Sequence, residues 1–376
     1  MRNPRPLTFQ TLGSLSLALA IASLQSSAMA QTTPPSAMDQ YNDPANLGHP
    51  LERRFDRLPL AGSAQTVPWT DTYWPKNKGG ITHRWQTEDA YTYLSPTLEQ
   101  LRAMPQDEIA KLSPSEKYDI YVGNYAYSLT TREKARNSPN ESSWQGYCHG
   151  WAPASINYAE PKPVTVVNPD GIAIPFGSSD VKALLTLFQG EVIQAGYYTV
   201  DQLPFKRDVK LAGSVAGTDD PSRPETADTN PGTLHLILAN LLGRERVAFA
   251  IDATTTAERW NQPVHRFRST VVDRHPAGPN VAPGVVEELV VVSEVTYTME
   301  IEPTWDAVGG TPEHTDTTKT YTYTLHLNAA GEIVGGQWIL RFNDGTFWTL
   351  KQTVEYLRTL DRDSDGQPDL AEVRVR

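Results

Sequence analysis

Hydrophobic positions recur at helical spacing in the first half of the chain. Within residues 95–136, Leu98 and Leu101 fall on one face of a helix. Ser95 and Ser113 each precede a glutamate by about one turn, as helix N-caps do. The pattern therefore predicts a helical region here.

A second helix is predicted over residues 178–191, where apolar residues again have helical spacing and Ser179 is placed as the N-cap. A long polar loop over residues 212–231 separates this helix from the second half of the chain.

After that loop, Val, Thr and Tyr alternate with polar residues, which predicts strands. The predicted strands cover residues 234–241, 247–253, 286–303 and 319–340, with turns at 328–331 and 335–336. Helices that precede an antiparallel sheet indicate an α+β fold.

The N-terminus has the features of a secretory signal. Arg2 and Arg5 precede the apolar run LGSLSLALAIASL, and small residues end at Ala30, so cleavage is expected before Gln31. The run is shorter than the roughly 20 residues that span a bilayer, which disfavours a membrane anchor. Residues 31–50 are polar and read as a flexible leader or pro-segment. We therefore expect a secreted or periplasmic protein with no membrane span after cleavage.

The charge balance is acidic. The chain has 44 acidic and 33 basic residues, a formal charge of −11. Removing residues 1–30 takes away two arginines and no acids, so the charge becomes −13. An acidic surface repels phosphate backbones, so a nucleic-acid partner is not expected.

The chain has one cysteine, Cys148, in the stretch SSWQGYCHGWAPASINYAEP. One cysteine cannot form an internal disulfide, so the thiol is a buried structural residue, an intermolecular partner or a nucleophile. Gly146 supplies a turn, and Pro153 is tolerated only near a helix start. Cys148 is therefore expected at the positive end of a helix dipole, which favours a reactive thiolate.

A nucleophilic thiol needs an imidazole, and the chain has eight histidines. His149 is set aside because neighbouring residues on a helix do not face each other. If residues 234–242 pair with 247–254, His235 opposes Thr254 and Asp252 lies diagonally on the same face. An acid there can orient the ring. On spacing alone, a structural His235 and a turn-closing Asp252 remain open.

Several segments together resemble the transglutaminase-elicitor family, which are secreted enzymes with a papain-type Cys, His and Asp arrangement. The segments are PWTDTYWP, LSPSEKYDIYVGN, YCHGWAPASINYAEP, SSDVKALLTL, NPGTLHLILANLLG, RWNQPV and GGQW, in order over about residues 50–350. The resemblance implies a papain/transglutaminase-like core, with Cys148 as nucleophile, His235 as base and Asp252 as orienting acid. Asn261 also follows His235 and is an alternative orienting residue.

The reaction that the resemblance implies is acyl transfer from a protein glutamine to a lysine amine through a thioester on Cys148. The backbone N–H of Cys148, with Gln145 or the Trp144 indole, would stabilise the oxyanion. Trp144, Trp151 and Trp260 would line an acyl tunnel, unless they are ordinary core residues. The alternatives are a thiol peptidase or amidase with the same triad, and a non-catalytic, calcium-stabilised surface protein that binds other proteins.

The stretch DRDSDGQPDLAE, residues 361–372, has the twelve-residue pattern of a calcium loop. Its predicted ligands are Asp361, Asp363, Asp365, the Gln367 carbonyl, Asp369 and Glu372. We expect a structural Ca²⁺ there, and no cofactor requirement for catalysis.

The predicted organisation has four parts. They are a signal peptide (1–30), a leader or pro-segment (31–50), a transglutaminase-like catalytic domain (51–350), and a C-terminal helix with the calcium loop (351–376).

Overall fold

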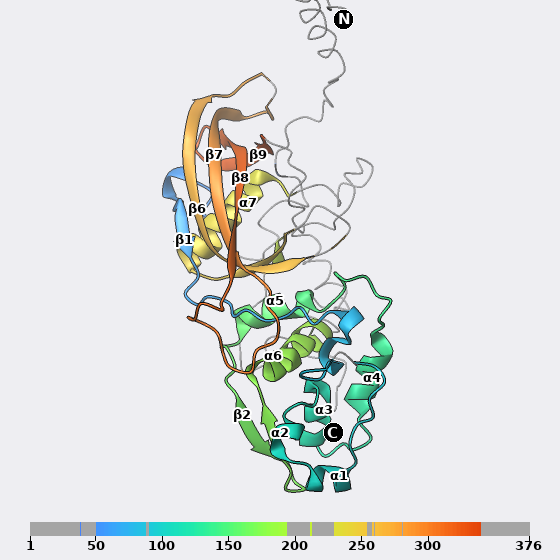
Figure 1. Ribbon diagram of the computed structural model, residues 1–376. Coiled ribbons are helices and arrows are strands. Elements are labelled where there is room, and N and C mark those ends of the chain that lie inside the picture. The colour runs from blue at the N-terminus through green and yellow to red at the C-terminus, as the bar shows by residue number, and fades with distance from the viewer. Residues whose placement is uncertain are drawn as a thin grey trace, which may run out of the picture. The chain divides into compact units, whose positions relative to one another are not determined.

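The computed structural model describes residues 38, 50–87, 90–193, 211–212, 229–253, 258, 260–279 and 281–339. The predicted signal peptide, most of the predicted leader, and the predicted C-terminal helix and calcium loop lie outside these residues. Within them, short helices come first and long antiparallel strands follow (Figure 1). The predicted α+β class is therefore confirmed.

The chain begins with short turns and short helices. The turns and first strand are η2 (Phe55–Arg57), β1 (Ala61–Ser63), η3 (Lys76–Lys78) and η4 (Gly80–Thr82). The helices are α1 (Leu98–Ala103), α2 (Gln106–Ile109), α3 (Pro114–Tyr121) and α4 (Ser128–Arg136). These four helices lie within the predicted helical region.

One of the two predicted N-caps in this region is correct. Ser113 caps α3: its hydroxyl accepts from the Glu116 N–H, and the Glu116 carboxylate accepts from the Ser113 N–H. The predicted cap at Ser95 is wrong, because Thr97 caps α1 and Ser95 donates to Glu116 instead.

The helix that begins at Cys148 and its neighbouring helix come next. α5 (Cys148–Asn157) is followed by the hairpin β2 (Val164–Val167) and β3 (Ala173–Phe176), then by α6 (Ser178–Leu187). α6 continues as the π-helix η5 (Phe188–Ile193). The helix predicted over 178–191 is present, but its cap is Gly177, whose N–H donates to Asp180. Ser179, the predicted cap, donates to the buried Asp71.

The sheet occupies the second half of the chain. Its strands are β4 (Leu211–Ala212), β5 (Phe249–Asp252), β6 (Asn261–Pro276), β7 (Val285–Thr298), β8 (Asp316–Asn328) and β9 (Ile333–Trp338), and they follow one another in that order across it. β1 also pairs with β6, and β4–β5 is the parallel pair. The turn predicted at 328–331 joins β8 to β9, whereas Gly335 and Gly336 lie inside β9.

The predicted strand at 234–241 is wrong, because this segment is helical. α7 (Pro231–Ile237) and the π-helix η8 (Leu238–Glu245) pack on the sheet, α7 against β8 and β9 and η8 against β1 and β6 (Figure 1). The segment is buried almost throughout. Because a fully buried helix is apolar on every side, its periodicity cannot distinguish it from a buried strand.

α5 connects the helical part to the sheet. It packs on α6 and η5 on one side and on β5 and β6 on the other (Figure 1). Trp151 of α5 contacts Trp69 and Ala250 in a small buried cluster. The first residue of α5, Cys148, is thereby brought to the first residue of β6, Asn261.

A buried ion pair joins α3 to α6 behind this contact. Lys117 Nζ lies 2.6 Å from Asp180 Oδ2, both side chains are fully buried, and the Trp85 indole N–H donates to the same carboxylate. Such a pair mainly fixes one arrangement of the helices, since desolvation offsets much of its attraction. α6 is therefore held in one position against α3.

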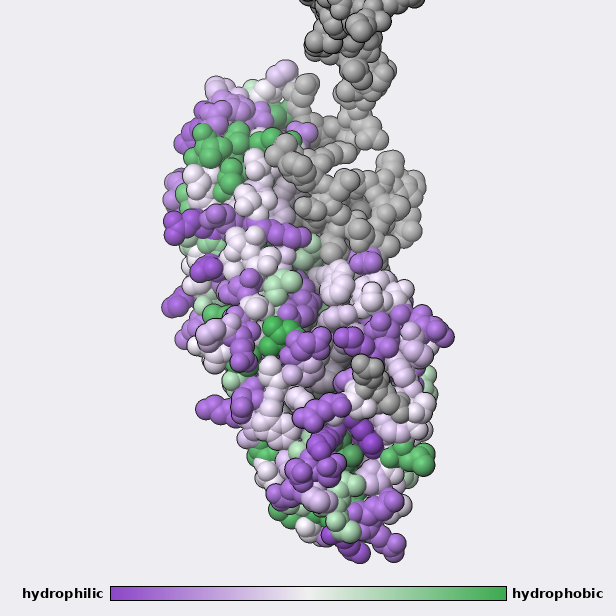
Figure 2. All heavy atoms as spheres, viewed as in Figure 1, coloured by the Kyte–Doolittle hydropathy of each residue, from purple (hydrophilic) through white to green (hydrophobic). Residues whose placement is uncertain are grey.

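The surface is mixed in character. On the face drawn in Figure 2, hydrophobic residues are scattered among hydrophilic ones. Among the described residues, no helix combines the length and the apolar character that a membrane crossing requires.

Candidate active site

The only cysteine begins a helix, as predicted. Cys148 is the first residue of α5 and is 4% exposed. The helix start is held from both sides: the Tyr147 N–H donates to the Tyr73 carbonyl at 2.7 Å, and the Tyr147 carbonyl accepts from the N–H groups of Gly150 and Trp151. This helix end carries partial positive charge, because its first N–H groups have no acceptor within the helix.

Asn261 donates a hydrogen bond to the thiol. Its Nδ2 lies 3.3 Å from the Cys148 Sγ, and the residue is 4% exposed. Asn261 pairs with Asp252 across β5 and β6, so the sheet register fixes the position of the amide.

His149 is the imidazole that the structure brings to the thiol. Burial lowers the pKa of His149, but hydrogen bonds and charge attraction from the side chains of Cys148 and Glu191 outweigh burial and raise it to about 9. The prediction discounted this residue because of its adjacency. Successive residues of a helix differ by only 100° around the axis, and an imidazole at the first turn reaches across that arc.

His235, the predicted base, lies elsewhere. Its Nδ1 is 2.9 Å from the Tyr323 hydroxyl, and its ring stacks on Phe55 with centroids 5.8 Å apart. Among the described residues, no hydrogen bond joins it to Cys148. The predicted ribbon of 234–242 with 247–254 does not form, because the first segment is α7 and η8 and the second pairs with β6.

The environment of His235 is apolar. The residue is fully buried in the cluster that α7 and η8 form with the sheet, between Phe55 and Tyr323. Burial without a charged partner lowers the pKa of His235 to about 4. The ring is therefore neutral at physiological pH and is placed as a core residue.

Asp252 keeps its predicted strand but changes its neighbour. It is the last residue of β5, and its backbone lies opposite Asn261 rather than near His235 in a hairpin. The predicted proximity of His235 and Asp252 on one ribbon is therefore wrong. Asn261, which lies opposite Asp252 on β6, is the residue that reaches the thiol.

The predicted substrate-binding residues lie in three different places. Trp144 and Gln145 lie in the turn before α5, where the Gln145 carbonyl accepts from the Lys76 N–H at 2.8 Å. Trp151 is fully buried within the cluster beneath α5, which is a core position. Trp260 precedes Asn261, and its ring packs edge-on against Tyr73 at 5.1 Å.

Tyr73 is a residue near the thiol that the sequence interpretation did not single out. Its hydroxyl donates to the Ser143 carbonyl at 2.6 Å, and burial together with the charges of Glu300 and Cys148 raises its pKa. A Cβ at Gly146 would lie 2.5 Å from the Tyr73 ring, so only glycine fits there. Tyr73 accepts from the residue before Cys148, and Trp260 precedes Asn261, so this ring pair, here called the aromatic wall, lies close to the thiol along the chain.

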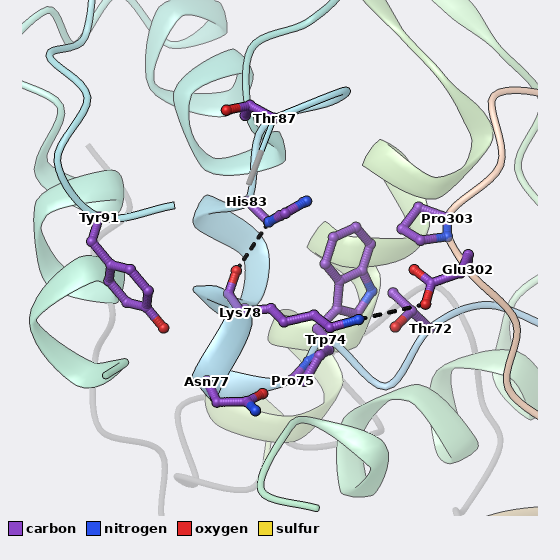
Figure 3. Close-up of a pocket in the computed structure, with 11 residues that line it drawn as sticks. Thr72, Trp74, Pro75, Asn77, Lys78, His83, Thr87, Tyr91, Glu302 and Pro303 are labelled. Carbon is purple, nitrogen blue, oxygen red and sulfur yellow. Dashed lines mark hydrogen bonds and ion pairs between the residues drawn. The ribbon is translucent and has the colours of Figure 1, made fainter. Parts of the chain in front are cut away.

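A pocket of about 370 Å³ is lined by Trp74, the residue that follows Tyr73 (Figure 3). Trp74, Pro75, Tyr91 and Pro303 contribute rings to its lining, and the exposed ion pair of Lys78 with Glu302, 3.5 Å apart, borders it. Trp74 has a φ of 51°, a backbone region that bulky residues rarely adopt. Cys148, His149 and Asn261 are not among the residues that line the pocket.

The predicted calcium ligands, Asp361 to Glu372, lie outside the described residues, so the calcium loop stays a prediction. Within the described ranges, no group of three His, Cys, Asp or Glu side chains is arranged to hold a metal ion.

Comparison with known proteins supports the fold. The family model described as transglutaminase elicitor matches residues 126–347, more than half of the chain. The chain is also similar to the crystal structure of the GP42 transglutaminase from Phytophthora sojae, with a TM-score of 0.54, 21% identity, and coverage of 81% of this chain and 88% of that one. At that identity the likeness shows the fold. No match was found among curated proteins.

Proposed function

The chain belongs to the transglutaminase elicitor family, and we propose that it transfers the acyl group of protein glutamine side chains to lysine amines through a thioester on Cys148. The observation that carries this proposal is the setting of the sulfur. The thiol begins α5, accepts from Asn261 and is hydrogen-bonded to His149.

The first half-reaction forms the thioester. The Cys148 thiolate attacks the carboxamide carbon, and the negative charge moves to the carboxamide oxygen. Protonated His149 then gives its proton to the leaving nitrogen, the C–N bond breaks, and ammonia departs. The thiolate is one cause of the high pKa of His149. Forming the thioester removes that charge, so the imidazolium becomes a stronger acid when ammonia must leave.

The second half-reaction reverses these roles. Neutral His149 accepts a proton from the incoming lysine amine, the amine nitrogen attacks the thioester carbon, and the C–S bond breaks to restore the thiolate. If water attacks in place of the amine, the product is glutamate. Exclusion of water by the Tyr73 and Trp260 wall would favour transfer.

The oxyanion would be stabilised at the start of α5. The first N–H groups of a helix have no acceptor within it and carry partial positive charge. We propose the backbone N–H of Cys148 as one donor and the Gln145 side chain as a second, because Gln145 is held in the turn that leads into α5.

His149 replaces His235 in this proposal because His235 is occupied by Tyr323 within the core. Asp252 as an orienting acid stays a prediction. We further propose that the protein acts after export, and that a Ca²⁺ held by residues 361–372 would stiffen the C-terminus without entering the chemistry.

The test is incorporation of a fluorescent primary amine into a glutamine-containing peptide, with ammonia release measured in the same samples. Wild type should perform both reactions, and Cys148→Ala should reduce both to background. Persistence of either reaction in Cys148→Ala would contradict the nucleophile. Ammonia release without amine incorporation would assign the protein to hydrolysis, as in the thiol amidase alternative.

A further inference from the structure

A chain of charged groups extends outward from the thiol beyond His149. The His149 Nε2 lies 3.9 Å from the Glu191 Oε1, and the other carboxylate oxygen of Glu191 lies 2.5 Å from the Arg136 Nη2. Arg136 ends α4 and Glu191 lies in η5, so three separate elements meet at the imidazole. His149 and Glu191 are half-buried, whereas Arg136 is exposed.

Close backbone packing brings Glu191 to this position. A Cβ on Gly150 would lie 2.2 Å from the Thr186 carbonyl oxygen and 3.0 Å from the Gly190 Cα. A Cβ on Gly190 would lie 3.2 Å from the Nε2 of His149. The two glycines therefore let α5 and η5 touch, and the residue after Gly190 reaches the ring.

The π-helix itself is part of the arrangement. α6 changes to π-helical geometry at Phe188, three residues before Glu191. Wider turns shift the direction of the side chains that follow, and such segments are frequent at functional sites. Here the change of geometry coincides with the contact to the nucleophile helix.

We propose that Glu191, held by Arg136, is the positioning residue that orients His149 and keeps it protonated beside the Cys148 thiolate. With Nε2 turned toward the carboxylate, Nδ1 is the nitrogen left to exchange a proton at the sulfur. This inference rests on the proposed function for its catalytic meaning, but its electrostatic part concerns the resting protein alone.

The charges agree with this geometry. Burial raises the pKa of Glu191, but the side chains of His149 and Arg136 outweigh burial and lower the pKa to about 2. The carboxylate is therefore ionised over the whole working range. Arg136 satisfies one of its oxygens and leaves the other to the imidazole.

The experiment measures the pKa of His149 by NMR in wild type and Glu191→Gln, with the resonance assigned by its absence in His149→Gln. The expected result is a fall of about one unit or more in Glu191→Gln, since an opposite charge within a few ångströms shifts a pKa by that much. Glu302→Gln, which removes an exposed carboxylate outside the site, should leave the pKa unchanged. An unchanged pKa in Glu191→Gln would overturn the inference.

Ammonia release supplies the second readout. The upper limb of the pH profile of kcat/KM should move to lower pH in Glu191→Gln and return partly in Glu191→Asp. The double variant with His149→Gln should lose no more activity than His149→Gln alone. Additive losses would overturn the inference and would identify a structural ion pair between α4 and η5.

The two readouts separate this inference from the proposed function. If wild type releases no ammonia, the proposed function fails, while the NMR titration still tests the contact between Glu191 and His149. If Cys148→Ala abolishes turnover but Glu191→Gln leaves the pKa and the pH profile unchanged, the proposed function stands and the inference fails.

Discussion

Two histidines of this protein are buried in different regions and behave in opposite ways. His149, at the start of α5, has its pKa raised to about 9, whereas burial lowers the pKa of His235, in α7, to about 4. Each makes a hydrogen bond through its ring. The difference lies in what surrounds them: ionisable side chains around the first, and Phe55 and Tyr323 around the second.

This difference shows that partners, rather than burial, decide which histidine can serve the thiol. Desolvation disfavours the cation in both places, and only a nearby anion reverses it. The region around α5 supplies Cys148 and Glu191, while the hydroxyl of Tyr323 carries no charge near neutral pH. Under the proposed function, the helix start is therefore the reactive region and the sheet cluster is the scaffold.

The largest expected effect comes from making the same substitution at both histidines. His149→Gln should reduce kcat/KM for ammonia release by about 10² to 10⁴, the usual contribution of a general acid–base group. His235→Gln should change it by less than about threefold, because its amide can still bond to Tyr323 and the ring is not used. Initial rates of ammonia release at pH 7.5 measure both.

Circular dichroism of both variants serves as the control, since only folded protein makes the rates comparable. If His235→Gln loses more activity than His149→Gln at equal folded content, the result would support the predicted triad and contradict the assignment of His149 as the acid–base group.

The next largest effect is on stability at acid pH. The pKa of His235 is lower in the folded state than its usual value of about 6.5. Its contribution to the free energy of unfolding is therefore fully present above pH 6.5 and is lost as pH falls toward 4. The loss in the free energy of unfolding should reach about 3 kcal/mol. Urea unfolding of wild type and His235→Gln at pH 7.5 and 4.5 isolates it, since the other groups titrate in both proteins.

His149 should affect the alkaline side of the curve of stability against pH. Its pKa is raised in the folded state, so its contribution is present below pH 6.5 and is lost as pH rises through 9. His149→Gln should therefore flatten the alkaline side of the stability curve and leave the acid side alone. Equal acid slopes in wild type and His235→Gln would show that the two regions do not differ as described.

The sequence was informative about the fold where polar and apolar residues alternate at a surface. The helices before the sheet, the cap at Ser113 and the helix start at Cys148 were all predicted correctly. The strand predicted over 234–241 was wrong because a fully buried helix is apolar on every side. Asn230 followed by Pro231 is nevertheless a signal for a helix start. β6 was overlooked, although Phe267 and Ser269 alternate there with exposed arginines.

The site was less predictable because tertiary packing assembles it. Cys148 could be chosen as the lone thiol, and Asn261 was weighed as an orienting residue. Glu191 and Arg136 carry no local signal, since Glu191 reaches His149 through the contact of Gly150 with Gly190, and Arg136 reaches Glu191 through the ion pair between α4 and η5. A sequence pattern records neighbours along the chain, and these residues are 42 and 13 positions away from His149.

The smallest expected effect concerns the other partner of the sulfur. Asn261→Ala removes the amide that lies 3.3 Å from Sγ. A hydrogen bond to a charged group contributes about 1.5 kcal/mol, so alkylation of Cys148 by iodoacetamide at pH 6 should slow by roughly tenfold. Gln262→Ala is the matched control, because the neighbouring amide donates to Glu300 rather than to the thiol and should leave the rate unchanged. If Asn261→Ala reacts as fast as wild type, the sheet does not support the thiolate, and His149 with the start of α5 must hold the charge alone.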